Sequence, residues 1–161
     1  MITEIDYMEY ATDALAQAAY VSNEGGNLQC FSESTIKSQG SYSLKGIAAI
    51  TDSANKTLTR TLSPTLDLSN RNVIKFDIRS SRTGSNIKLG IYEGANLRSE
   101  ITPNIISANT WQRVNWYLSG VANADKDAID KIVITITEAT ESNIFYIDNF
   151  YIAPRQKIMI V

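Results

Sequence analysis

The chain has 161 residues, of which 43% are apolar, and its 15 Lys and Arg against 17 Asp and Glu give a net charge of −2. This length fits one domain with a single core, and the charge balance argues against a nucleic-acid-binding protein. Because the sequence contains no His, it excludes a Ser-His-Asp triad, a Cys-His pair and histidine-ligated metals. The single cysteine, Cys30, has no partner for a disulfide within the chain, so we expect it to be a small buried side chain.

The N-terminal segment lacks the basic region and apolar run of a secretory signal, and no run of roughly eighteen apolar residues predicts membrane insertion. Three origins stay open. The protein works inside a cell, was cut from a longer secreted polypeptide, or leaves the cell at lysis as part of a phage particle. The last two predict a virion or extracellular location.

β-Branched residues dominate the periodic parts of the sequence, with 21 Ile and 14 Thr, so strands are expected. Apolar and polar residues alternate most clearly in four segments: 74–78, 87–91, 114–118 and 132–136. Less regular strands are expected over four more segments: 27–32, 41–50, 56–62 and 144–152. Because no amphipathic helices separate these segments, we predict an all-β antiparallel jelly-roll sandwich of about eight strands.

A short N-terminal helix is expected up to Tyr20, with Thr12 or Asp13 as its cap. The side expected to face the sandwich carries Leu15, Ala18 and Ala19. A second helical turn is expected over residues 125–130, before the strand that begins near Ile132.

The last long strand changes parity within its length. Phe145 and Ile147 share one side, whereas Phe150 and Ile152 fall on the other. A bulge near Asp148 and Asn149 would return the later residues to the core and change the direction of the Asp148 carboxylate. We therefore predict a β-sandwich domain over residues 1–153, followed by an apolar tail over residues 154–161 that pairs with a partner subunit.

Six short segments, in a fixed order, together resemble a known family. They are 8–10, 40–45, 110–114, 118–120, 129–132 and 146–150. In this order and spacing they are similar to the galactose-binding-like β-sandwiches, which include the carbohydrate-binding modules of polysaccharide-degrading enzymes. The resemblance covers most of the chain and concerns the fold more than any particular ligand.

The resemblance also implies a structural calcium site that joins the two ends of the domain. The matching carboxylates are Glu9 and Asp148, with backbone carbonyls near Gln39 and Ser41 as further ligands. Calcium prefers several hard oxygen ligands, and one ion would stabilise a chain that has no disulfide. The alternative is that both carboxylates are solvated or hydrogen-bonded to the backbone.

Alternation also predicts which side chains of the strands face solvent. If the strands near Ile74, Ile87 and Val114 are neighbours, their outward residues form one polar face, which is a candidate glycan-binding surface. Its members are Asp77, Arg79, Lys88, Tyr92, Arg113, Asn115 and Tyr117. Aromatic rings stack on sugars while polar side chains bind hydroxyls, but the same composition also fits a solvated sheet with ion pairs.

The two tryptophans are not expected to contribute to this face. Parity places Trp116 in the core, and Trp111, at a strand entrance, is expected to be a core residue as well. Tyr92 and Tyr117 are then the rings available for stacking.

We therefore expect a non-catalytic module that binds a polysaccharide or surface glycan. The alternative is a structural protein on the same fold, such as a phage capsid decoration or tail-associated protein, because both ends of the chain carry apolar residues that favour self-association or docking. An enzyme is not expected, since no two carboxylates are marked as a facing pair. A lyase that uses Tyr117 with Lys88 is the remaining catalytic alternative.

Overall fold

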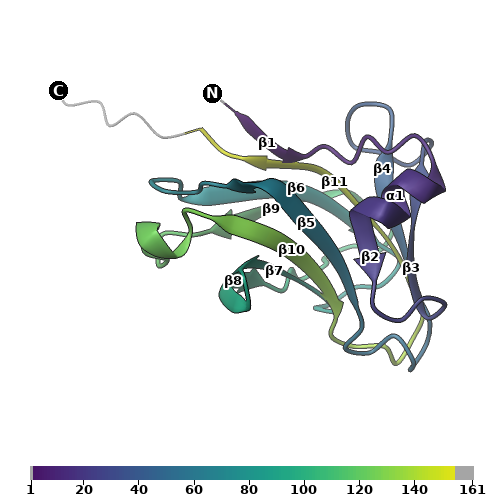
Figure 1. The fold of residues 1–161 in the computed structure, drawn as a ribbon. Coiled ribbons are helices and arrows are strands. Elements are labelled where there is room, and N and C mark those ends of the chain that lie inside the picture. The colour runs from purple at the N-terminus through teal and green to yellow at the C-terminus, as the bar shows by residue number, and fades with distance from the viewer. Residues whose placement is uncertain (1, 155–161) are drawn as a thin grey trace.

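The computed structural model describes residues 2–154, which form two antiparallel β-sheets packed face to face (Figure 1). Sheet A has the order β3-β4-β11-β6-β9, with β1 also paired to β11. Its strands are β1 (Thr3–Asp6), β3 (Leu28–Glu33), β4 (Ser43–Ala48), β6 (Val73–Ser80), β9 (Gln112–Tyr117) and β11 (Asn143–Ile152). Sheet B has the order β2-β5-β10-β7-β8. Its strands are β2 (Tyr20–Ser22), β5 (Thr57–Leu66), β7 (Ile87–Glu93), β8 (Asn96–Ile101) and β10 (Ile129–Ile136).

The predicted antiparallel sandwich is confirmed, and its core consists of the alternating side chains that face between the sheets. Trp116 lies in this core, as predicted, with its indole Nε1 donating to Ser99 Oγ at 2.9 Å. Phe76 and Phe150 stack there with ring centroids 5.2 Å apart. Cys30 is buried, also as predicted, and burial raises the pKa of its thiol to about 12.

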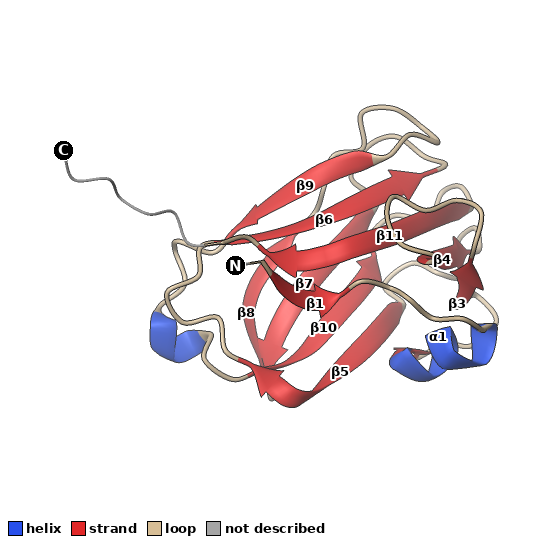
Figure 2. Cartoon of the chain, turned by 90° about the horizontal axis from the view of Figure 1, so that it is seen from above, coloured by secondary structure: helices blue, strands red, loops and turns tan. Residues whose placement is uncertain are grey.

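The predicted helix exists as α1 (Asp13–Ala19), and Thr12 Oγ1 accepts a hydrogen bond from Leu15 N at 3.2 Å as its N-cap. The expectation that Leu15 and Ala18 face the sandwich is wrong, because both are exposed, Leu15 by 54%, and Ala16 is the buried residue of this helix. Ala19 packs against the core, as predicted. α1 lies at the edge of the sandwich beside β3 (Figure 2). A seven-residue helix at a sheet edge therefore buries a single small side chain.

Other elements differ from the sequence prediction mainly where strands are short. β1, β2 and β8 lack a long alternating pattern and were not expected. The helical turn before β10 is η1 (Asn123–Asp125), earlier than the expected segment over residues 125–130. No helix within residues 2–154 is long and apolar enough to cross a membrane.

The predicted bulge in β11 is confirmed. Pairing with β6 follows one register up to Asp148 and resumes at Tyr151, and Asn149 has a positive φ of 54°. The extra residue returns Phe150 and Ile152 to the core, where both are almost fully buried. The partner-binding tail predicted over residues 154–161 lies outside the described residues except for Pro154.

Gly46 on β4 provides a test of the core packing, because the Phe145 ring lies directly over its Cα. A Cβ atom there would lie far inside van der Waals distance of that ring. Gly46→Ala is expected to lower the free energy of unfolding by about 1–3 kcal/mol. The control is Gly120→Ala, where a Cβ has open space and the change should stay within about 0.5 kcal/mol. Urea titration measures both, and equal stability of the two variants would contradict this packing.

Candidate functional site

The structure brings together five of the seven residues predicted to share a polar face. β6 and β9 are neighbours, and the register pairs Asp77 with Arg113 and Lys75 with Asn115. Arg79 and Tyr117 lie on the same side of these strands, which is the outer face of sheet A, directed away from sheet B. The five residues that share this face are Asp77, Arg79, Arg113, Asn115 and Tyr117.

Lys88 and Tyr92 do not belong to this face. Both lie on β7, which is a strand of sheet B, where they flank the segment from Leu89 to Ile91, whose two apolar residues are buried. The expectation of one shared face is therefore wrong for these two residues, because alternation separates inner from outer side chains but does not assign a strand to a sheet. The same separation removes the catalytic pairing of Tyr117 with Lys88.

Two of the five residues bind each other. The Arg113 guanidinium forms an ion pair with the Asp77 carboxylate, and this contact raises the pKa of Arg113. Arg113 also donates to the Tyr151 hydroxyl at 3.0 Å and lies 5.7 Å from the centre of that ring. Asp77 accepts a further hydrogen bond from Ser38 Oγ at 2.7 Å. The Asp77 and Arg113 side chains thus mainly satisfy each other and their neighbours.

A line of larger side chains crosses the outer face of sheet A two residues along β6 from Asp77. Register pairs Phe31 with Lys45, Lys45 with Tyr146, and Tyr146 with Arg79 across β3, β4, β11 and β6. Trp111 immediately precedes β9 and extends the line beside Arg79, since Gln112 pairs with Ile78. We call these five residues, in which aromatic rings alternate with cations, the aromatic row: Phe31, Lys45, Tyr146, Arg79 and Trp111.

The Trp111 end of the aromatic row is the part with the closest ring contact. The Trp111 and Tyr146 ring centroids are 6.4 Å apart and the ring planes are inclined by 57°. Tyr146 is 7% exposed, and burial, followed by the Glu33 carboxylate, raises its pKa while Arg79 opposes this rise. Trp111 is half-buried on the outer face, so the expectation of a core position for it is wrong.

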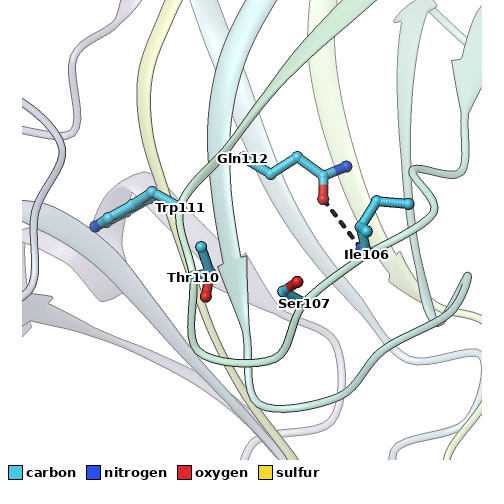
Figure 3. A pocket seen from close by; sticks show the side chains of 5 residues that line it. All are labelled: Ile106, Ser107, Thr110, Trp111 and Gln112. Atoms are coloured by element: carbon cyan, nitrogen blue, oxygen red, sulfur yellow. Dashed lines mark hydrogen bonds between the residues drawn. The ribbon is translucent and has the colours of Figure 1, made fainter.

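A hollow of about 210 Å³ adjoins Trp111 and is lined by Ile106, Ser107, Thr110, Trp111 and Gln112 (Figure 3). Gln112 holds the loop that forms it, because its amide accepts from Ile106 N at 3.2 Å and donates to Asn104 O at 2.9 Å. In Figure 3 the Trp111 side chain points away from the Gln112 side chain. Ile106 is 71% exposed, so the hollow opens to solvent beside the aromatic row.

Sequence reasoning missed Phe31, Lys45, Tyr146 and Trp111 as candidate site residues. The parity of β11 placed Tyr146 opposite Phe145 and Ile147, which is a signal for the outer face. That signal identifies a site only when the strand order of sheet A is known. The alternation of residues within each strand does not predict which strands pair.

The outer face of sheet B is different in character. Its central row pairs Val21 with Thr59, Thr59 with Val133, and Val133 with Gly90. Lys88 on this face forms an ion pair with Glu100, with Nζ and Oε2 3.3 Å apart. Within β2, β5, β7 and β10, Tyr92 is the aromatic residue on this outer face. The outer face of sheet B therefore has fewer rings for stacking on a sugar than the outer face of sheet A.

The contacts of Asp148 do not fit the predicted calcium site. One carboxylate oxygen accepts from Ser38 N at 2.8 Å and from Gln39 N at 3.1 Å. The other accepts from Asn149 N at 2.7 Å and from Gln39 Nε2 at 3.3 Å. Burial raises the pKa of this carboxyl group while these donors oppose the rise. Four N–H donors occupy the lone pairs that a cation would need.

Glu9, the other carboxylate of the predicted calcium site, is held in the same way. It accepts from Ser41 N at 3.1 and 3.0 Å and from Tyr42 N at 3.3 Å. Gln39 Nε2 also donates to Tyr7 O at 3.1 Å, so one amide joins the N-terminal segment to β11. Within residues 2–154, no group of three acidic or cysteine side chains is placed to hold a metal. Calcium binding stays a prediction, but its expected ligands are hydrogen-bonded to N–H groups.

Comparison with known proteins identifies the fold. No protein-family model matches the sequence, and no curated protein matches it. Among solved structures, the family 11 carbohydrate-binding module from Clostridium thermocellum, in complex with a β-1,3-1,4-mixed-linked tetrasaccharide, is similar with a TM-score of 0.62, 16% identity and 94% coverage of both chains. A family 30 carbohydrate-binding module is similar with a TM-score of 0.64 and 16% identity, covering 97% of this chain and 94% of that one.

Similar domains also occur within larger enzymes. An exo-β-agarase matches with a TM-score of 0.66 and 16% identity over 81% of this chain, but only 23% of the agarase chain is covered. The predicted resemblance to carbohydrate-binding modules is therefore confirmed at the level of the β-sandwich fold. The comparisons give no support to the virion alternative.

An Asp148→Asn variant tests the two accounts of this carboxylate. If the carboxylate is an acceptor for N–H groups, the free energy of unfolding should fall by about 2 kcal/mol or more. The NH2 group of the new Asn side chain cannot accept hydrogen bonds from the N–H groups that donate to the carboxylate. The drop in melting temperature relative to the unmodified protein should be the same in excess calcium and in excess chelator. If the drop is present in calcium and disappears in chelator, the carboxylate is a metal ligand. The exposed Asp52→Asn is the matched control, with no change expected in either solution.

Proposed function

We propose that the protein is a non-catalytic glycan-binding module that binds sugar on the outer face of sheet A. The observation that carries this proposal is the aromatic row, in which Phe31, Tyr146 and Trp111 lie on one face of a sandwich that has the fold of carbohydrate-binding modules. Apolar ring faces and polar groups set side by side are the combination that sugar recognition requires.

The spacing of the rings supports an extended ligand rather than a single sugar. The two half-buried rings of the aromatic row, Phe31 and Trp111, lie at its opposite ends, four strand spacings or about 19 Å apart. A span of this length exceeds a single sugar ring. The hollow beside Trp111 extends the surface at that end.

A binding role fits the described residues better than catalysis. Hydrolysis of a glycosidic bond needs two carboxyl groups that face each other across the bond. On the outer face of sheet A, Asp77 is paired with Arg113, and Asp148 is held by four N–H donors and is fully buried. Glu33 accepts hydrogen bonds from the backbone N–H groups of Thr35 and Ile36. Each of these carboxylates is thus bound by donors of the protein itself. The neighbours of similar length are also binding modules.

A pair of ring deletions tests the proposal and assigns the face. Trp111→Ala removes a ring from the aromatic row, whereas Tyr92→Ala removes the ring of the sheet B face. In binding measurements against a panel of soluble and insoluble polysaccharides, Trp111→Ala should weaken retention at least tenfold, about 1.4 kcal/mol, while Tyr92→Ala leaves it unchanged. Melting curves confirm that both variants fold.

The opposite result for the two variants would assign the binding site to the other sheet. If Tyr92→Ala weakens binding and Trp111→Ala does not, the glycan binds sheet B. If the unmodified protein retains no polysaccharide of the panel, the glycan-binding proposal fails.

A further inference from the structure

The two cations of the aromatic row, Arg79 and Lys45, have no hydrogen bond or ion pair among residues 2–154. The Arg79 Nε is buried with no hydrogen-bond partner, and no ion pair or hydrogen bond joins its guanidinium to any residue in the range 2–154. Lys45 likewise has no ion pair or hydrogen bond among these residues. A guanidinium that is half-buried without an acceptor has lost hydration without regaining a hydrogen bond, which is unfavourable unless another molecule supplies the acceptor.

Several other cations form ion pairs, whereas Lys75 on sheet A and Lys131 on sheet B have neither an ion pair nor a hydrogen bond among residues 2–154. Arg113 pairs with Asp77, Lys88 with Glu100, and Arg82 with Glu138 at 2.5 Å. The carboxylate nearest to the row is Glu33, which interacts electrostatically with Lys45 and Tyr146. Its oxygen accepts from Thr35 N at 2.6 Å and Ile36 N at 3.2 Å. Glu33 therefore stabilises the turn that follows β3 and does not form an ion pair with Lys45.

Arg79 lies beside a pair of aromatic residues in the strand register. It is paired with Tyr146 on β11 and neighbours Trp111 at the start of β9, and these two rings contact each other with centroids 6.4 Å apart. A planar guanidinium offers two parallel N–H donors that match the two oxygens of a carboxylate or a sulfate ester. The neighbouring half-buried Trp111 ring suits the apolar face of the sugar that carries such a group.

We infer that the preferred ligand of the aromatic row is an anionic glycan, whose sugar units carry a carboxylate or a sulfate ester that pairs with Arg79 and, one ring further along, with Lys45. This inference rests on the proposed function and adds the ligand class to it. The alternation of ring and cation along the row then matches a polysaccharide in which each sugar supplies an apolar face and a negative group.

The test compares four probes with the full chain: polygalacturonate for carboxylates, dextran sulfate for sulfate esters, mixed-linkage β-glucan as a neutral glycan, and polyglutamate as a polyanion without sugar. Binding to one of the two anionic glycans should be at least tenfold tighter than to β-glucan and polyglutamate, and should weaken as salt is raised. The anionic glycan that binds more tightly identifies the charged group.

Arg79→Met keeps the length of the side chain and removes its charge, and it should reduce anionic-glycan binding at least tenfold. Lys131→Met on β10 of sheet B is the matched control, because it changes the net charge equally and lies on the other face. Its binding should equal that of the unmodified protein. Arg79→Lys keeps the charge but lacks the two parallel N–H donors of the guanidinium, so its loss of anionic-glycan binding should be intermediate.

The outcomes separate this inference from the proposed function. Tight binding to β-glucan that depends on Trp111 but not on Arg79 would overturn the anionic preference and leave the glycan-binding module standing. Equal loss in Arg79→Met and Lys131→Met, or equal binding to polyglutamate, would show general charge attraction and overturn the inference as well. No binding to any glycan would overturn both.

Discussion

The pairing register of β11 determines which side chains reach the outer face of sheet A. This strand pairs with β4 and β1 along one edge and with β6 along the other, so it aligns three other strands of the sheet. In its first half, Tyr146 lies between Lys45 and Arg79. A slip of one residue would exchange Tyr146 with the buried Phe145 or Ile147 and place a large apolar side chain in solvent. The core therefore holds the aromatic row in place.

The bulge at Asn149 divides β11 into two parts that direct different residues to the outer face. Before it, Tyr146 belongs to the aromatic row and Asp148 makes its buried polar contacts. After it, Phe150 and Ile152 return to the core, and Tyr151 contacts Arg113 on the outer face. The segment over residues 36–39 is attached to Asp148 by N–H donors and to Asp77 by Ser38. The part of the outer face around Asp77 and Asp148 is thus covered by the protein itself. The aromatic row carries cations that have no hydrogen bond or ion pair among residues 2–154.

The sequence predicts the content of the core better than the arrangement of the site. Alternation identifies the inward residues of the four regular strands, and the change of parity in β11 locates the bulge, because both depend on neighbours along the chain. Lys88 and Arg79 look equivalent by this criterion, yet they lie on different sheets. Their separation depends on which strands pair, and that is decided by packing across the whole domain. The carboxylates of Glu9 and Asp148 could be named from the resemblance. Most of the N–H groups that donate hydrogen bonds to them belong to a loop, which has no periodic pattern from which these contacts could be predicted.

The most direct test of the account is to map amide and indole chemical shifts of isotope-labelled protein during titration with oligosaccharides, using both a mixed-linkage β-glucan tetrasaccharide and an oligogalacturonate. The account predicts that the largest shifts occur in β3, β4, β11, β6 and the Trp111 indole. Shifts that concentrate in β5, β10 and β7, around Val133 and Tyr92, would contradict it and would place the glycan on the outer face of sheet B.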